Sequence, residues 1–213
     1  MRNQFDKQLD LMHTSLVEMG QLCEDAIEAA MEAVETGDSE LARQAIESDS
    51  QIDDKEREIE AMCMKLLLQQ QPVARDLRTI SAALKMISDM ERIGDQSTDI
   101  AEISRHISRH HLENHELLHS MATAAIAMVR GAVDSFVTRD EKLAQKIIGD
   151  DDTVDQLFLT VKRQLIARVV ADAENGEYYL DMLMIAKYLE RIADHATNVA
   201  EWVLFSITGS REG

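Results

Sequence analysis

The feature that most constrains this chain is an internal repeat, because a duplicated sequence predicts a duplicated structure. Residues 36–42 (Thr-Gly-Asp-Ser-Glu-Leu-Ala) return in similar form as residues 138–144 (Thr-Arg-Asp-Glu-Lys-Leu-Ala). Residues 90–95 (Met-Glu-Arg-Ile-Gly-Asp) return as residues 189–194 (Leu-Glu-Arg-Ile-Ala-Asp). The two spacings differ slightly, as is expected where loops of different length join paired helices. We therefore expect two tandem structural units.

The units are predicted to cover residues 1–112 and 113–213 and to meet near residues 111–119. Apolar residues recur at steps of three and four, which is the period of an amphipathic helix. One proline, eight glycines and 4% aromatic residues are too few for a turn-rich β fold. We predict an all-α protein with a three-helix bundle in each repeat. The six helices are expected at about residues 5–35, 39–70, 75–110, 114–137, 140–173 and 177–207.

Charge and cysteine content restrict the partners. The chain has 40 acidic and 22 basic residues, and its formal net charge is −18. This charge repels nucleic acids and favours basic partners and metal cations. Its longest apolar stretch, residues 121–129, is shorter than the roughly 18 residues of a membrane span, and residues 1–7 lack the apolar core of a secretory signal. Cys23 and Cys63 have no metal-type spacing and are expected to be reduced and buried. We expect a cytoplasmic protein.

Acidic side chains form a stripe on one helix of each repeat. At 100° per residue, the stripe falls within a sector about 60° wide. In the first repeat it contains Glu91, Asp95, Thr98 and Glu102, with Asp99 beside it. In the second repeat it contains Glu190, Asp194, Asn198 and Glu201. Asn198 stands where the first repeat has Asp99, so the second stripe carries one charge fewer.

A second pair of acids is predicted to face each stripe across a helical hairpin. A turn near Pro72 sets Asp53 level with Glu91, and it sets Asp49 level with Asp95. In the second repeat, the corresponding turn pairs Asp155 with Glu190 and Asp151 with Asp194.

Four carboxylates at one level repel one another unless they are protonated or neutralised by a cation. Oxygen donors without cysteine suit hard cations, iron or manganese better than structural zinc. We therefore predict a site for iron, manganese, zinc or another divalent metal in each repeat. The alternative is a solvated acidic surface with Arg92 and Arg191 as counter-charges. The metal candidates are Asp49, Asp53, Glu91, Asp95 and Asp99, and Asp151, Asp155, Glu190, Asp194 and Asn198.

Other motifs give no chemical step. Five histidines crowd the junction between the repeats and could form a zinc or nickel site or a pH-sensitive joint, although a polar connector is favoured: His106, His110, His111, His115 and His119. Glu116 and His119 form a single Glu-x-x-His, whereas a di-iron oxidase needs this motif on two helices. Phosphate-cradling loops, nucleophile elbows and nucleotide-binding glycine patterns are absent from the sequence. We predict neither catalysis nor an organic cofactor.

Three segments resemble the PhoU family. They are residues 72–80 (Pro-Val-Ala-Arg-Asp-Leu-Arg-Thr-Ile), residues 90–102, and residues 189–201, which repeat the pattern of residues 90–102. Together with the duplication, the resemblance covers nearly the whole chain. The chain departs from the family pattern at residues 172–176, which replace the proline turn and its Asp-Leu-Arg stretch in the second repeat.

The resemblance implies two symmetry-related three-helix bundles and a negative regulator of the phosphate-starvation response. Such a regulator links the ATPase subunit of a phosphate ABC transporter to the sensor domain of a histidine kinase. It works at the cytoplasmic side and touches the membrane only through these partners. The resemblance also places metal on Glu91/Asp95 and Glu190/Asp194, and we expect a homodimer. The alternatives are a metal-storage or metal-dependent redox bundle and a metal-free scaffold. Since no phosphate site is visible in the sequence, we expect the phosphate signal to arrive through a partner.

Overall fold

The computed structural model describes residues 2–70, 72–107 and 116–210. All regular elements in these residues are helical, which confirms the all-α prediction. The elements are α1 (Arg2–Thr36), α2 (Ser39–Gln70), α3 (Ala74–Ser104), α4 (Glu116–Thr138), α5 (Glu141–Ala171), a 3-10 turn η2 (Ala173–Asn175) and α6 (Gly176–Thr208).

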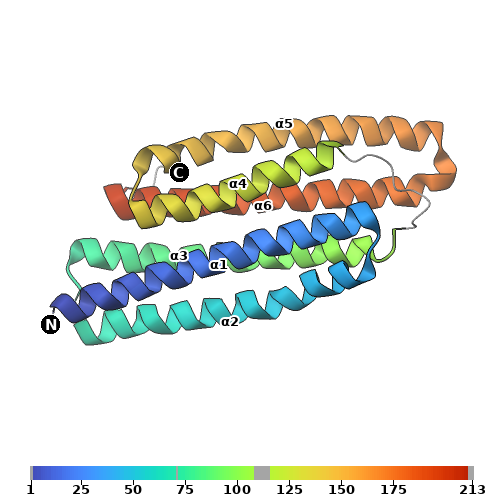
Figure 1. Ribbon diagram of the computed structural model, residues 1–213. Helices are drawn as coiled ribbons and strands as arrows, with labels where there is room; N and C mark the ends of the chain where they lie inside the picture. Colours follow the sequence, from blue (N-terminus) through green and yellow to red (C-terminus); the bar gives the residue numbers. More distant parts are fainter. Residues whose placement is uncertain (1, 71, 108–115, 211–213) are drawn as a thin grey trace.

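The helices form two three-helix bundles that lie side by side (Figure 1). Helices α1 to α3 make the first bundle, and α4 to α6 make the second. The bundles run in opposite directions, so the turn between α2 and α3 lies at the other end of the molecule from the turn between α5 and α6 (Figure 1). Between bundles, α3 packs against α6 and α1 packs against α4. The boundary predicted between residues 112 and 113 lies outside the described residues.

Local backbone chemistry sets the helix ends. Helix α3 starts after Pro72, with Val73 in an extended conformation (φ −73°, ψ 164°). Asp140 caps α5 by accepting hydrogen bonds from the N–H groups of Lys142 and Leu143 at 3.0 and 3.1 Å. Gly209 ends α6 in the left-handed conformation, at φ 80°.

Two helices were predicted to extend further than they do. The helix expected to reach His110 ends at Ser104, because the N–H groups of Arg105 and His106 bond to carbonyls three residues back and tighten the last turn. Helix α5 ends at Ala171, where Asp172 N–H bonds to Arg168 O at 2.8 Å and η2 follows. Residues 108–110 and the expected cap Asn114 lie outside the described residues.

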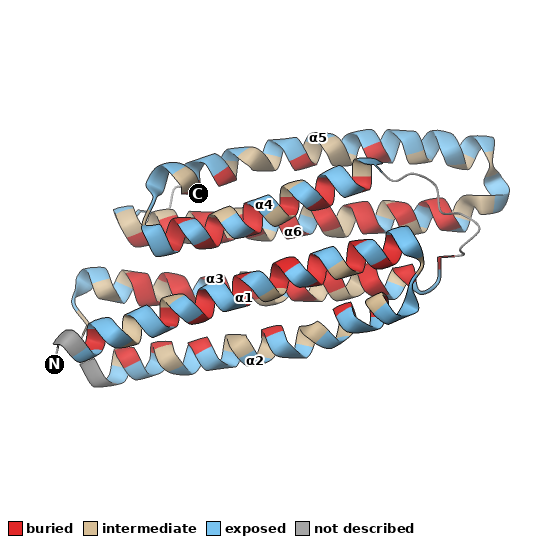
Figure 2. Ribbon diagram, in the orientation of Figure 1, coloured by how far each residue is buried: buried red, intermediate tan, exposed pale blue. Residues whose placement is uncertain are grey.

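Buried residues lie along the helix faces that point toward other helices (Figure 2). Eight methionines among the described residues are buried in this core and fill it as the helical spacing predicts: Met12, Met19, Met31, Met86, Met90, Met121, Met128 and Met182. Cys23 and Cys63 are buried and unpaired by any disulfide, as predicted. Burial raises the pKa of both thiols, that of Cys63 to about 12.

Helix α4 is long and apolar enough in composition to cross a membrane, although its continuous apolar run covers only residues 121–129. However, 56% of its apolar stretch is buried inside the protein. It packs against α1, α5 and α6. Its apolar character is that of a core helix, so its length is weak evidence for a membrane span.

Candidate functional site

A glycine brings the first acidic stripe close to its facing acids. A Cβ atom on Gly94 of α3 would lie 2.9 Å from Cδ1 of Ile52 and 3.4 Å from Oδ1 of Asp49, both on α2. Glycine therefore favours this close approach, because a methyl group at position 94 would force Ile52 to shift. The approach sets Asp49 near Asp95, and the charges of Asp95 and Asp53 add to partial burial in raising the pKa of Asp49. This pairing is the one that the helical register predicts.

In the second repeat, the residue that corresponds to the glycine is one carbon larger, and the residue that it faces is one carbon smaller. Ala193 stands where the first repeat has Gly94, and Val154 stands where it has Ile52. All three side chains, Ile52, Val154 and Ala193, are fully buried. A larger residue on α6 is thus matched by a smaller one on α5, which preserves the packed volume of the hairpin.

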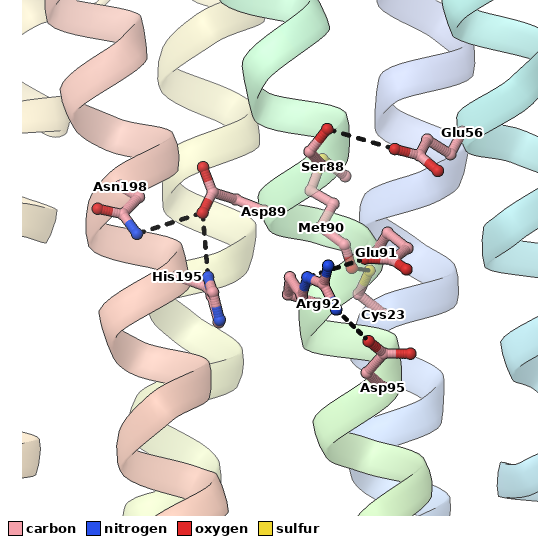
Figure 3. A network of polar contacts seen from close by, with 10 residues as sticks. All are labelled: Cys23, Glu56, Ser88, Asp89, Met90, Glu91, Arg92, Asp95, His195 and Asn198. Carbon is pink, nitrogen blue, oxygen red and sulfur yellow. Dashed lines mark hydrogen bonds and ion pairs between the residues drawn. The ribbon is translucent and has the colours of Figure 1, made fainter.

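Arg92 partly neutralises the first acidic cluster (Figure 3). Its Nη1 lies 3.1 Å from Asp95 Oδ2, and its Nε lies 3.4 Å from Glu91 Oε2. Partial burial and the Asp95 charge still raise the pKa of Glu91, against the opposing effect of Arg92. Asp53 is paired with Arg57, 3.3 Å away on the same helix. At Glu91, burial and carboxylate repulsion together therefore outweigh the compensation by Arg92.

The second acidic cluster is neutralised by a lysine instead. Lys187 forms an ion pair with Glu190 and lies over the ring of Phe158, 5.4 Å from its centre. Desolvation raises the pKa of Asp194 to about 6, and the charges of Glu190 and Asp151 add to this. The pKa of Asp151 is raised as well, by partial burial and then by Asp155. The predicted facing of α5 and α6 acids is therefore present in the fold.

The two acidic clusters contain the donor atoms that a metal site needs, but their side chains are not arranged around a common point. Carboxylate oxygens suit hard cations. Among the described residues, however, no three Asp, Glu, His or Cys side chains converge closely enough to hold one ion. Arg92 and Lys187 form ion pairs with carboxylates that would have to bind the metal. Metal binding would require the carboxylates to leave these ion pairs.

The structure places Asp99 and Asn198 at the seam between α3 and α6, where they face residues of the other repeat. Asp89 Oδ1 lies 3.0 Å from His195 Nδ1 and accepts a hydrogen bond from Asn198 Nδ2 at 3.2 Å (Figure 3). In the reciprocal contact, Tyr188 lies near Asp99, and the Asp99 charge adds to partial burial in raising the pKa of Tyr188. Tyr188 occupies in the second repeat the position of Asp89 in the first, so the two contacts are related by the pseudo-symmetry of the chain.

Sequence reasoning missed Asp89, Tyr188 and His195 as seam residues. Their reciprocal role follows from the repeat alignment only once the helices that pack together are known, because the alignment alone does not say that α3 meets α6. A second link between the repeats joins α1 to α4: Glu24, whose side chain is only 6% exposed, accepts a hydrogen bond from Arg130 Nε at 2.9 Å.

The structure describes only two members of the predicted histidine cluster. His106 is exposed in the turn that follows α3. His119 on α4 lies 3.1 Å from Glu35 on α1 through Nδ1 and Oε1. His110, His111 and His115 lie outside the described residues.

Comparison with known proteins agrees with the duplicated architecture. The PhoU domain matches the chain twice, over residues 16–104 and 118–203. A protein of Clostridium acetobutylicum named phosphate-specific transport system accessory protein PhoU homolog is 34% identical, and the match covers 99% of this chain and 97% of that protein.

Two crystal structures share the fold. That of PhoU from Pseudomonas aeruginosa has a TM-score of 0.91 and 32% identity, covering 97% of this chain and all of that one. That of the phosphate transport system regulatory protein PhoU from Streptococcus pneumoniae has a TM-score of 0.90 and 27% identity, covering 98% of this chain and 99% of that one. On the duplicated domain, the full-length relatives and the shared fold, this chain belongs to the PhoU family.

Proposed function

We propose that this chain is a negative regulator of the phosphate-starvation response. In this role it is an adaptor, not an enzyme, between the ATPase subunit of a phosphate ABC transporter and the sensor domain of a histidine kinase. The observation that carries the proposal is the family match over both repeats, with relatives named as accessory proteins of phosphate transport. The paired bundles support it, because they present similar acidic surfaces at two places on one molecule. Each surface suits a basic partner.

The adaptor role is tested by deleting the gene and measuring a phosphatase reporter at high and low phosphate. We expect constitutive expression in the deletion strain and restored repression when the intact chain is supplied. Repression that persists in the deletion strain would contradict the proposal. Pull-down of the purified ATPase subunit and of the kinase sensor domain by this chain tests the two contacts separately.

The cellular location and assembly state belong to the same proposal. We place the protein in the cytoplasm as a homodimer that reaches the membrane only through its partners. Light scattering after size exclusion should give twice the chain mass of 24.0 kDa. Cell fractionation should release the protein from membranes when the transporter is deleted. A monomer at micromolar concentration, or membrane association without the transporter, would contradict these expectations.

The acidic clusters are proposed to hold iron, manganese, zinc or another divalent metal. Asp49, Asp53, Glu91 and Asp95 would supply the ligands in the first repeat, and Asp151, Asp155, Glu190 and Asp194 in the second. The raised pKa values support this, since a cation would relieve the repulsion that causes them in part. Bound metal would supply charge neutralisation between the helices.

Elemental analysis of protein purified without chelators tests the metal proposal. We expect stoichiometric metal in the native chain and its loss in a variant carrying Asp95→Asn and Asp194→Asn. The matched control is Asp152→Asn, which removes the same charge from the exposed side of α5. Absence of metal after reconstitution would return both clusters to solvated acidic surface. A metal-storage or redox role would require, beyond this, a metal that changes oxidation state with a defined substrate.

A further inference from the structure

A basic cluster stands at one end of this strongly acidic molecule. It consists of Arg75 and Arg78 at the start of α3, Arg139 in the turn between α4 and α5, and His13 on α1, and we call it the arginine cluster. The start of α3, the α4–α5 turn and the end of α6 all lie at this end of the molecule (Figure 1). The cluster could not be recognised in the sequence, because its members come from separate segments of both repeats.

The charges of the cluster's arginines act on one another without compensation by carboxylates. Burial and the charges of Arg75 and Arg78 lower the pKa of Arg139, and no carboxylate opposes this effect. Within the described part of the chain, none of the three arginines forms an ion pair, whereas Arg43, Arg57, Arg92 and Arg130 all do. The nearby acid Asp10 acts on His13, and Asp140 is engaged as the cap of α5.

Two nitrogen atoms of the cluster are buried without a hydrogen-bond partner among the described residues. They are Nε of Arg78 and Nε2 of His13. The remaining polar contact is long, since Arg139 Nη1 donates to Thr79 Oγ1 at 3.5 Å. Buried polar groups in native proteins are nearly always paired, and an unpaired one destabilises the fold. The unpaired nitrogen atoms therefore point to a missing hydrogen-bond partner.

The backbone holds Arg139 in a conformation that disfavours it. Arg139 has a φ of 56°, and the equivalent residue of the first repeat is Gly37, at φ 64°. Glycine adopts this conformation freely, whereas arginine is strained there. The second repeat thus accepts local strain to present a guanidinium at this point.

Neighbouring groups also restrict the other members of the cluster. The ring of His13 packs edge-on to Phe136, with 5.4 Å between ring centres. The backbone of Gly209 covers Arg78, since a Cβ atom at Gly209 would lie 3.5 Å from the guanidinium carbon. These contacts reduce the conformational freedom that would be lost on binding.

We propose that Arg75, Arg78, Arg139 and His13 bind a tetrahedral oxyanion of the phosphate type, either free phosphate or a phosphoryl group on a larger molecule. Guanidinium groups bind phosphate oxygens through paired N–H donors, and several of them offset the charge of a dianion. The His13 ring adds an N–H donor without a full charge, because burial lowers its pKa. The site occurs once, since the second repeat lacks the equivalents of Arg75 and Arg78.

Phosphate titration of the metal-free protein tests the site. Binding would be measured by calorimetry and thermal unfolding in chloride buffer with a chelator, at pH 7.5 and fixed ionic strength. The probes are inorganic phosphate and phenyl phosphate. Saturable binding of inorganic phosphate would assign the free anion, and binding of phenyl phosphate alone would assign an esterified phosphoryl group. Saturable binding of neither at millimolar concentration would overturn the proposal.

Charge-matched variants show whether binding occurs at the arginine cluster. Arg139→Gln and Arg78→Gln should each weaken binding about tenfold, the effect of one charge-assisted hydrogen bond. Arg163→Gln removes the same charge from the exposed surface of α5 and should leave binding unchanged. Without phosphate, Arg139→Gln should raise the melting temperature, because it relieves repulsion and unpaired burial. If Arg78→Gln does not fold, the more exposed Arg75→Gln takes its place. Equal weakening in Arg163→Gln, or none in the cluster variants, would overturn the site.

This binding test is independent of the proposed regulatory role. It uses purified protein alone, so phosphate binding can fail while repression in cells persists, and the reverse is equally measurable. Where both hold, the site would give the regulator a direct phosphate input in place of the partner-borne signal expected from the sequence.

Discussion

Replacing Asp194 by asparagine should stabilise the protein at neutral pH. Its folded-state pKa of about 6 compares with an ordinary value of 3.8. At 1.36 kcal/mol per pKa unit, this shift corresponds to at most about 3 kcal/mol of folded-state repulsion and desolvation. Because Asp194 is exposed, solvent screening reduces the expected gain to about 1 kcal/mol. For a chain of this length, that gain raises the melting temperature by about 2–4 °C.

The sign of the pH dependence distinguishes charge removal from a simple packing effect. An acid whose pKa is raised on folding destabilises the folded state above that pKa, and the penalty disappears as pH falls toward the unfolded value. The native chain should therefore gain stability between about pH 6 and pH 4 from this residue. Asp194→Asn should lose that gain, so the variant and the native chain should converge near pH 4.

Urea unfolding in chelator at pH 7.5, 6 and 4.5 measures the effect, with Asp152→Asn as the control for one lost charge on the same bundle. Destabilisation at pH 7.5, or an equal gain at all three pH values, would refute the electrostatic reasoning. Added metal provides a second contrast. If both acidic clusters bind it, metal should stabilise the native chain more than the Asp194→Asn chain, which keeps only the first-repeat cluster.

Three further substitutions test packing and pairing. Gly94→Ala should destabilise the protein by about 1–2 kcal/mol in urea unfolding despite its better helix propensity, since the new methyl group meets Ile52 at 2.9 Å. Adding Ile52→Val, which removes that contact, should recover much of the loss, and a purely additive double variant would contradict the stated clash. Arg130→Gln should destabilise by about 1–3 kcal/mol, more than Glu24→Gln, because it leaves a buried carboxylate unpaired. Equal thermal shifts for these two would contradict the assigned burial of Glu24.

Local chemistry allowed much of the fold to be predicted from the sequence. The apolar period predicted all six helices, and the repeat predicted that each bundle has three. Errors arose at helix ends such as Ser104, where tight i to i−3 hydrogen bonds stop a helix that periodicity alone would extend. The pairing of Asp49 with Asp95 was also predictable, because an antiparallel hairpin fixes the level of residues equally distant from its turn.

The packing of one repeat on the other was not predictable from local pattern. Asp99 and Asn198 were assigned only to the acidic clusters, but the fold places them in the contacts with Tyr188 and Asp89 between α3 and α6. The helical period says which residues share a face, and it does not say which helix covers that face.

The sequence by itself determined the helices, their duplication and which acidic residues lie opposite one another in each hairpin. These features depend on spacing within continuous segments. Only the tertiary structure decided what lies across the bundles: the seam of α3 and α6, the burial of Glu24 and the arginine cluster. Arg75, Arg78 and Arg139 are distant in sequence, and their charges meet only because antiparallel packing of the repeats brings the start of α3 to the α4–α5 turn. A site built from such separated residues exists only once the chain has folded.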